Sequence, residues 1–248
     1  MQVRIYLLLP MALLLPPGAQ GGEIIGGREA KPHSRRYMAF LEIHDEKGKK
    51  KCGGFLVKPN FVLTAAHCRG RKITVMLGAH NVRNRERSQQ EIPARRWVPH
   101  PEYDKETYNN DIMVLQLSRS ALLNKWVRLI PLPNAKSRVR LGSNCSVAGW
   151  GRTDRNSGTD ILHEVDLEVM KDDKCDEYLA YNSSTMLCVG KPGLKKLPYR
   201  GDSGGPLVCE GVAQGIVSYV DDDWLGPSVF TRLSKFVPWI QNILKNQS

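Results

Sequence analysis

A single serine in a glycine-rich turn is the first residue of this chain that could do chemistry. Ser203 lies within the hexapeptide GDSGGP at residues 201–206. Small residues around a serine let the backbone fold tightly and expose its amide N–H groups. A nucleophilic serine needs that setting, because its hydroxyl must be accessible and nearby donors must stabilise the oxygen that becomes negative during acyl transfer. The same hexapeptide could be a plain turn between strands, so the sequence must also supply partners for the serine.

Two further segments supply those partners. The segment TAAHC at residues 64–68 places His67 after an apolar run, and Asp111 directly precedes the apolar run at 112–117, where a charge is hard to keep fully in water. Together with the serine in its glycine-rich turn, these two segments favour nucleophilic acyl transfer over a plain turn. The other histidines are assigned to surface or loop positions: His33, His44, His80, His100 and His163.

The first residues predict a secretory signal. Arg4 gives a positive start, and the apolar stretch at 5–15 is broken by Pro10 and is far shorter than the ~20 residues that span a bilayer. Small residues at positions 19 and 21 match those that a signal peptidase reads. We therefore expect residues 1–21 to be a signal peptide, and we expect no membrane span.

The composition is that of a globular secreted protein. The chain has 248 residues, of which 41% are hydrophobic, which is enough for one large all-β domain or two small ones. Its six cysteines predict disulfides in an oxidising compartment, and no CxxC pair points to zinc. The sequence alone does not choose among the possible pairings, and it indicates no metal or cofactor.

The net charge of +11 and the sequence pI of about 9.5 indicate attraction to a polyanion. Any one basic cluster could be a solvated loop, whereas together the clusters favour a polyanionic partner. For a secreted protein, sulfated glycosaminoglycan is more available than nucleic acid, so we expect the former and not the latter. The clusters are Lys47, Lys49, Lys50 and Lys51; Arg69, Arg71 and Lys72; Arg83, Arg85 and Arg87; Arg95 and Arg96; and Lys195 and Lys196.

Short apolar or alternating runs, separated by turn residues, predict strands. Their even spacing favours a sandwich or barrels over alternating strands and helices. A polar, basic stretch at about residues 130–141 predicts a connection between two halves, so a site that combines His67 and Asp111 with Ser203 would lie in the cleft between them. The predicted strands cover residues 37–43, 54–57, 61–65, 73–77, 112–117, 146–149, 165–170, 206–209, 213–219 and 228–231.

One helix is predicted at the C-terminus. Ser234 can cap it, and its apolar face predicts that it docks on the body of the fold. A shorter helix is expected to start near Asp172. The apolar residues at helical spacing in the C-terminal helix are Phe236, Ile240, Ile243 and Leu244.

The three segments, in the order His, Asp, Ser, resemble those of the chymotrypsin family of trypsin-like serine proteases over the whole chain after the signal peptide. The stretch IIGGREAKPHS at residues 24–34 is similar to the granule proteases of leukocytes and mast cells, which include granzymes, cathepsin G and chymases. The resemblance implies an all-β fold over residues 24–248, with two antiparallel six-stranded β-barrels, an active site in the cleft between them and a C-terminal helix. It also implies a monomeric protease that acts on protein or peptide substrates and is secreted through granules.

The resemblance implies a role for each residue of the predicted site. His67 would take the proton from Ser203 and give it to the leaving amine, while Asp111 would hold the His67 ring in the right tautomer. The N–H groups of Gly201 and Ser203 would stabilise the oxyanion. Ser218 would hydrogen-bond the buried aspartate and support the substrate backbone.

The resemblance also selects the disulfides, which are Cys52–Cys68, Cys145–Cys209 and Cys175–Cys188. The first would brace the loop that carries the histidine. Many relatives have a further bridge beside the specificity pocket, but Tyr199 occupies the matching position here. Granule proteases commonly lack that bridge, so this departure supports the subfamily.

Gly22-Glu23 resembles the two-residue activation propeptide of granule proteases, which a dipeptidyl peptidase removes. Its removal would free the α-amine of Ile24 to fold inward and pair with Asp202. Such a buried ion pair would order the loop that shapes the oxyanion hole. The alternative leaves Asp202 as a turn residue and Glu23 as a surface acid.

The primary specificity pocket is inferred from the same resemblance. Leu197 would lie at its base, where trypsin-like members have an aspartate, and Val220 at a wall where wide pockets have glycine. With Ser228 at a third position, the pocket would be shallow and apolar and would favour small or medium aliphatic residues; the alternative is a chymotrypsin-like preference for Phe, Tyr or Leu. Tyr219 is also expected to bind substrate. Arg200 would favour acidic residues past the scissile bond, unless it is a solvated surface arginine.

Glycosylation is predicted at Asn182, in the triplet Asn182-Ser183-Ser184 of a turn-like loop. Two other triplets are less suited to it. Asn144 sits at a predicted disulfide and strand, and Asn246 lies at the very end of the chain.

A rival function belongs to a different class. Some cationic granule proteins of this fold have lost catalysis and act as binding or antimicrobial proteins, a role that the basic clusters would serve. Intact His67, Asp111 and Ser203 argue against that function, although binding and catalysis can coexist.

Overall fold

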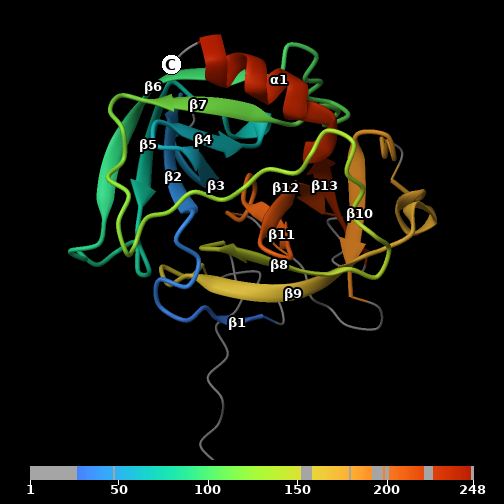
Figure 1. The fold of residues 1–248 in the computed structure, drawn as a ribbon, viewed down its shortest axis with the longest axis horizontal. Helices are drawn as coiled ribbons and strands as arrows, with labels where there is room; N and C mark the ends of the chain where they lie inside the picture. Colours follow the sequence, from blue (N-terminus) through green and yellow to red (C-terminus); the bar gives the residue numbers. More distant parts are fainter. Residues whose placement is uncertain are drawn as a thin grey trace, which may run out of the picture.

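The computed structural model describes residues 27–246, with gaps at residues 47, 152–157, 179, 192–197, 199–200 and 221–225. Strands dominate it, and they close into two antiparallel barrels with the C-terminal helix lying over the first (Figure 1). Each barrel closes through six strands. The expected fold class is therefore confirmed.

The first barrel closes in the order β2-β3-β4-β7-β6-β5. Successive side chains of a strand point to opposite faces, so every second residue enters the core. Leu41 and Ile43 in β2, and Val75 and Leu77 in β5, follow that period and are fully buried. The strands of this barrel are β2 (Met38–Asp45), β3 (Gly48–Lys58), β4 (Phe61–Thr64), β5 (Lys72–Leu77), β6 (Gln90–Pro99) and β7 (Met113–Leu117).

The second barrel closes in the order β8-β9-β10-β13-β12-β11, and β11 pairs back with β8. The short strand β1 (Arg28–Glu29) pairs with the start of β9. Leu187, Leu207 and Phe230 are among the buried residues of this core. The strands of the barrel are β8 (Asn144–Gly149), β9 (His163–Val169), β10 (Met186–Gly190), β11 (Pro206–Cys209), β12 (Val212–Val220) and β13 (Ser228–Arg232).

Three strands, β1, β6 and β10, were not predicted from the sequence. The pattern of β6 is weak because it contains Pro93 and two adjacent arginines, and Ile92 is its one fully buried residue. Its pairing with β7 also shifts register between Ala94 and Arg96. β10 is short and buried along its whole length, so it shows no alternation of apolar and polar residues.

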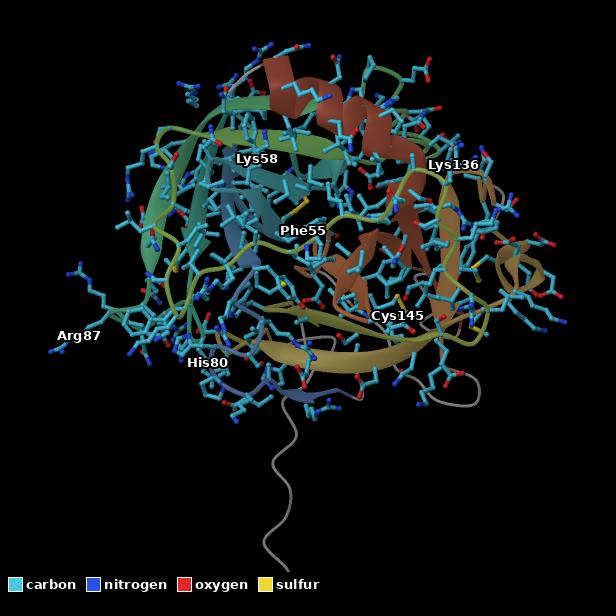
Figure 2. The ribbon with its side chains drawn as sticks, in the orientation of Figure 1. Phe55, Lys58, His80, Arg87, Lys136 and Cys145 are labelled. Carbon is cyan, nitrogen blue, oxygen red and sulfur yellow. A yellow bond between two sulfur atoms is a disulfide. The ribbon has the colours of Figure 1, made fainter. Side chains whose placement is uncertain are left out.

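The C-terminal helix α1 (Leu233–Asn246) begins one residue earlier than its predicted cap, so Ser234 lies buried within the first turn and is not the N-cap residue. The apolar face of α1 joins the core of the first barrel, as expected from its spacing. Lys58 of β3 donates a hydrogen bond to the Leu244 carbonyl at 2.9 Å and so ties down the end of the helix (Figure 2). No helix in the part of the chain that the structure describes is long and apolar enough to cross a membrane.

The two barrels are joined by the connection that follows β7, which includes the predicted stretch at 130–141. The Ile130 amide donates to Leu56 of the first barrel, and the Ala213 amide of the second donates to Pro131. This segment is the yellow-green coil that crosses the front of Figure 1. Two short 3-10 turns, η1 (Ala66–Cys68) and η2 (Asp172–Cys175), complete the elements, and η2 begins where the shorter helix was expected.

Three disulfides cross-link the chain: Cys52–Cys68, Cys145–Cys209 and Cys175–Cys188. These are the pairs that the resemblance implied. Each bridge stabilises the fold by ~2–4 kcal/mol through its constraint on the unfolded chain.

The assignment of the remaining histidines to surface or loop positions is wrong for His163, which is buried in β9. His44 lies in β2 and is partly exposed. His100 is in a loop, but its ring packs at 5.2 Å from the ring of Phe236 and 5.0 Å from that of Trp239. This burial against α1 lowers the pKa of His100.

We expect the protein to lose stability on acidification through His100. The folded state holds its pKa below the ordinary value of 6.5, so the unfolded state takes up the proton first. The stabilising contribution is complete above pH 6.5 and is lost as the pH falls through the folded pKa. Thermal melts between about pH 7.5 and 4.5 should show a smaller fall in Tm for His100→Gln than for the parent protein. Equal falls in the two proteins would contradict the prediction.

Candidate active site

Asp111 and His67 meet at one edge of the first barrel because of the strand register. β4 and β7 are antiparallel neighbours, with Thr64 opposite Met113. His67 follows β4 in η1, and Asp111 precedes β7, so both residues leave the sheet at the same edge. Asp111 Oδ2 lies 2.7 Å from His67 Nδ1, and the His67 amide donates to Asp111 Oδ1 at 3.0 Å.

The second barrel holds the other side of the same aspartate. Ser218 Oγ of β12 donates to Asp111 Oδ2 at 2.6 Å, and Thr231 Oγ1 of β13 donates to the Asp111 carbonyl at 2.8 Å. Asp111 is fully buried, and both of its carboxylate oxygens accept hydrogen bonds. Because a carboxylate only accepts, the proton of the His67 ring lies on Nδ1, which leaves Nε2 free to accept a proton from a nucleophile.

The turn that carries Ser203 precedes β11 of the second barrel. It packs against the end of β4 in the first barrel. The Gly53 amide donates to the Ser203 carbonyl at 2.8 Å. A Cβ atom on Gly204 would lie 2.1 Å from Thr64 Oγ1 and 2.5 Å from the Gly53 carbonyl oxygen. The close approach therefore requires glycine after the serine, and it brings Ser203 to the edge where His67 lies.

Two backbone N–H groups of this turn are available to a ligand. Among the residues that the structure describes, the N–H groups of Gly201 and Ser203 make no recorded hydrogen bond, whereas those of Gly204 and Gly205 donate to backbone carbonyls. Gly201 has a φ of 108°, and a Cβ atom there would lie 2.8 Å from Gly151 Cα. The left-handed backbone and the lack of space both require glycine at this position.

Three tyrosine rings, Tyr108, Tyr219 and Tyr178, form a row of contacts that begins at His67, and we call this row the aromatic wall. The ring of Tyr108 lies 5.6 Å from that of His67 and 5.6 Å from that of Tyr219, and Tyr219 lies 5.9 Å from Tyr178. Burial raises the pKa of Tyr219 to about 12, so its hydroxyl stays protonated at neutral pH. Tyr219 was among the predicted site residues, whereas Tyr108 and Tyr178 were not. The position of Tyr108 just before the aspartate, in the segment YNND, was the available signal for the first of them.

Comparisons with known proteins identify the family of this chain. A family model described as Trypsin matches residues 24–240. The chain belongs to the trypsin family. It is 52% identical to cathepsin G of Homo sapiens, with 97% of this chain and 94% of that protein covered. It is 52% identical to granzyme B of Homo sapiens, with 96% and 98% covered, and 53% identical to duodenase-1 of Bos taurus, with 97% and 96% covered.

A solved structure entitled "Structure of GrC" agrees with this assignment. It has a TM-score of 0.86 to this chain and is 47% identical to it, and the match covers 90% of this chain and 100% of that one. This trypsin-family protein is a serine endopeptidase, and its substrates are proteins or peptides.

Two of the residues predicted to form the primary specificity pocket lie on neighbouring strands. Val220 of β12 lies directly opposite Ser228 of β13. Ser228 is 1% exposed, and its hydroxyl has no hydrogen-bond partner within the described residues. Leu197 and Arg200 fall outside the described residues, as does Ile24 of the predicted activation pair.

Asp202 points into the second barrel. It is fully buried, and its Oδ1 accepts a hydrogen bond from the Gly151 amide at 2.8 Å. A Cβ atom on Gly149 would lie 2.0 Å from Asp202 Oδ1, and one on Gly151 would lie 2.5 Å from Oδ2. These two glycines therefore leave the space that the Asp202 carboxylate occupies. A residue that only formed a turn would not need such a buried space for its side chain.

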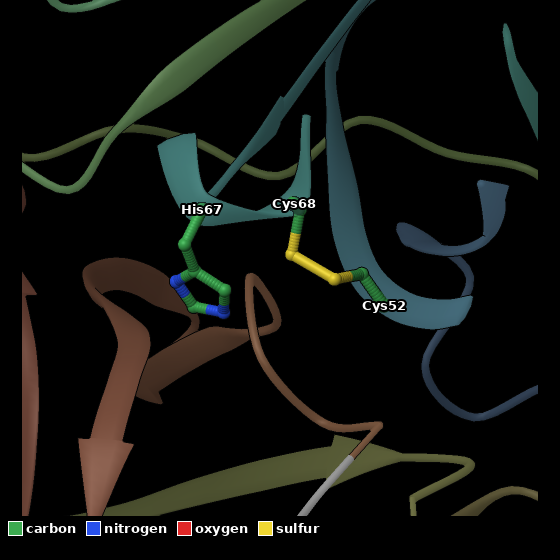
Figure 3. Close-up of side chains that lie close together, drawn as sticks. All are labelled: Cys52, His67 and Cys68. Atoms are coloured by element: carbon green, nitrogen blue, oxygen red, sulfur yellow. A yellow bond between two sulfur atoms is a disulfide. The ribbon is translucent and has the colours of Figure 1, made fainter. Parts of the chain in front are cut away.

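Cys52, His67 and Cys68 lie close enough together to suggest a metal site (Figure 3). The two cysteine sulfurs are joined to each other in a disulfide. Metal binding needs thiolates, so this group cannot act as a zinc site. The bridge instead fixes η1, and with it the histidine, to β3.

A cavity of about 620 Å³ adjoins the histidine. Its charged side chains have both signs, and Trp97 supplies an apolar face. The lining residues are Asp45, Glu46, Lys50, His67, Arg69, Gly70, Arg71 and Trp97.

Proposed function

We propose that Ser203 is the nucleophile of this endopeptidase and that His67 is its general base. The serine hydroxyl attacks the peptide carbonyl carbon while its proton passes to His67 Nε2, and the N–H groups of Gly201 and Ser203 bind the resulting oxyanion. The intermediate then breaks its C–N bond, and His67 gives the proton to the leaving amine. Water, deprotonated by His67, attacks the acyl-enzyme ester, which releases the acid and restores the serine.

The observation that carries this proposal is the contact of 2.7 Å between Asp111 and the His67 ring. It fixes the tautomer that leaves Nε2 free to accept a proton. A fluorophosphonate probe, which reacts with activated serines, should label the mature protein but not Ser203→Ala. Ser118→Ala changes an exposed serine elsewhere and should keep full labelling. Equal labelling of Ser203→Ala would refute the assignment, and an unlabelled parent protein would favour the rival cationic binding function.

We propose that the protease is made with a signal peptide at residues 1–21 and a propeptide at Gly22-Glu23, which a dipeptidyl peptidase removes. The family match begins at residue 24, which supports a mature N-terminus at Ile24. The mature domain would then run from residue 24 to 248. We further propose that the mature protein is monomeric. Storage in secretory granules of leukocytes or mast cells is also proposed, because the relatives include cathepsin G, granzyme B and a mast cell protease.

The strand order supports an activation pair between the Ile24 α-amine and Asp202. Glu29 of β1 lies opposite His163 of β9, which lies opposite Gly149 of β8 beside the aspartate. Two steps between strands cover ~10 Å. The stretch from residue 24 to 29 can extend over ~17 Å, so the freed N-terminus has enough chain to reach the buried carboxylate.

We propose that the primary pocket takes small or medium aliphatic residues such as Val, Ala, Leu or Met. The pairing of Val220 with Ser228 supports a narrow pocket, because it places a branched side chain opposite a buried residue. Leu197 would supply an apolar base. Cleavage after Phe or Tyr remains the alternative, and strong cleavage of Phe peptides in a peptide library would defeat the aliphatic preference.

The side chain of Val220 should limit the size of the residue that the pocket accepts. We expect Val220→Gly to raise kcat/KM for Phe substrates relative to Val substrates by about 10–100-fold, because each methylene changes the preference of an apolar pocket by ~1–3 kcal/mol. Val212→Gly makes the same change at the other end of β12 and should leave the ratio unaltered. An unchanged ratio in Val220→Gly would place Val220 outside the pocket.

We also propose that Arg200 favours acidic residues past the scissile bond, that Asn182 carries a glycan and that sulfated glycosaminoglycan is a partner. Asn182 is exposed in the loop before β10, so the acceptor triplet is accessible. Its Oδ1 accepts a hydrogen bond from Ser184 Oγ at 2.7 Å. The net charge of +11 supports a polyanionic partner. No nucleic-acid substrate follows from these features.

A further inference from the structure

An open cavity of about 700 Å³ lies beside the second barrel, and its lining includes no residue of the candidate active site. It is bordered by the connection between the barrels, the loop before β10 and the first turn of α1. Figure 2 labels Lys136 on that connection. No residue of the proposed catalytic site, the aromatic wall or the proposed specificity pocket is among those that line it.

Four cationic side chains face this cavity, namely Lys136, Arg138, Arg232 and Lys235. None of them forms a salt bridge within the part of the chain that the structure describes. Asp172 is the one carboxylate in the lining, and it accepts a hydrogen bond from the hydroxyl of Tyr181. The cavity therefore has an excess of positive charge that its own acid does not balance.

Arg232 is the rigid member of the group. Its Nη2 donates to the carbonyls of Ser183 at 2.9 Å and Met186 at 2.7 Å, which fixes the guanidinium at the wall. Its Nε is buried and has no hydrogen-bond partner in the described chain. Burial lowers the pKa of Arg232, so the fold holds this cation in surroundings that an anion would improve. The three other cations are exposed at the rim and can close around a ligand.

The lining favours a sulfated sugar over a nucleic acid. Single-stranded nucleic acids gain much of their affinity from bases that stack on aromatic rings, and no aromatic side chain is among the described residues that line the cavity. Hydroxyls of Ser137 and Ser183 and the aliphatic side chains of Val139 and Leu187 are present instead. The volume lies in the range of small-ligand sites, which is more than one isolated ion needs. The disulfides place the protein in an oxidising compartment, where sulfated polysaccharides occur.

We propose that this cavity is a subsite for a sulfated saccharide unit of a glycosaminoglycan, with Arg232 at its wall and Lys136, Arg138 and Lys235 at its rim. The inference rests on the polyanionic partner of the proposed function and assigns it a place. It is independent of the catalytic assignment, because peptide hydrolysis uses none of these residues.

The test compares two double variants that each remove two exposed positive charges. Lys136→Gln with Arg138→Gln changes the cavity rim, and Arg85→Gln with Arg87→Gln changes a basic loop of the first barrel, where Figure 2 labels Arg87. Binding of a heparin-derived tetrasaccharide is measured by calorimetry on the full-length mature protein at about 0.15 M salt. The protein is first deglycosylated, because Asn182 adjoins Ser183 and Ser184 of the lining.

The cavity variant should bind the tetrasaccharide about tenfold more weakly or worse, because two charged contacts are lost, while the control should stay within about twofold of the parent. A loss in the control variant alone would overturn the inference and leave the polyanionic partner standing. No binding by the parent protein would overturn both. If the parent protein bound a desulfated tetrasaccharide as tightly as the sulfated one, the assignment to sulfate would be overturned. The same would hold if the parent protein bound an oligonucleotide equally tightly and the cavity variant lost that binding. Hydrolysis of a short peptide should be unchanged in both variants, which shows that they are folded.

Discussion

Replacing the aspartate by its uncharged isostere, Asp111→Asn, should lower kcat by about 10⁴-fold, the loss that the same change causes in the chymotrypsin template. The carboxylate accepts hydrogen bonds from the His67 amide, the His67 ring and Ser218. An amide can present its NH₂ group to Nδ1, and the ring then holds its proton on Nε2, where it cannot accept the proton of Ser203. Steady-state kinetics on a chromogenic peptide measures the effect, with KM expected to change little.

Ser218→Ala is the matched control for this variant. It removes one donor to the carboxylate but keeps the charge and the ring contact, so its effect on kcat should be far smaller than that of Asp111→Asn. A circular dichroism melt of each protein shows whether the fold is retained. A loss of less than about tenfold in Asp111→Asn would mean that His67 does not depend on Asp111 for its tautomer, and the proposed triad would fail.

Protein that retains Gly22-Glu23 should be about 10²–10³-fold less active than the trimmed protein, and Asp202→Asn should cause a similar loss in the trimmed form. Breaking a buried ion pair costs ~3–5 kcal/mol, and each 1.4 kcal/mol is about tenfold in the population of the ordered state. The buried position of Asp202 beside Gly149 and Gly151 leaves its carboxylate little freedom to find another cation. The measurement is kcat/KM before and after removal of the dipeptide.

The two changes should not add, because each removes one side of the same pair. Asp202→Asn made in protein that keeps the dipeptide should therefore cause little further loss. Asp160→Asn, which changes an acid paired with Arg83 on the surface, should not affect activity in either form. Equal kcat values for trimmed and untrimmed parent protein would rule out activation by the free N-terminus.

Much of the fold was predictable because several strands combine apolar runs with clear turn residues at their ends. β4, β7 and β11 are of this kind, and their residues lie in the two cores. The pattern of a strand shows which face is buried but not which strand lies beside it. Closure of the second barrel through β11 and β8, for example, joins residues far apart in the chain, and it was expected from the resemblance alone.

The candidate site was predictable where chemistry imposes a local sequence, and not where it depends on contacts between the barrels. Ser203 and His67 stand in recognisable short segments, so the residue types alone suggested acyl transfer. Thr231 and Gly53 do not, because a backbone carbonyl or amide leaves no signature in the sequence of its partner. Tyr108 stands just before Asp111, which was a usable signal, but its ring contact with Tyr219 of β12 depends on how the two barrels pack.

The donors around Asp111 have a consequence for how this protein can be divided. The first barrel supplies the carboxylate and the imidazole, and the second supplies Ser218 and Thr231, which lock that acid in place. A gene segment that encoded either half alone would thus inherit an incomplete apparatus. We therefore expect that neither barrel hydrolyses peptides when it is separated from the other.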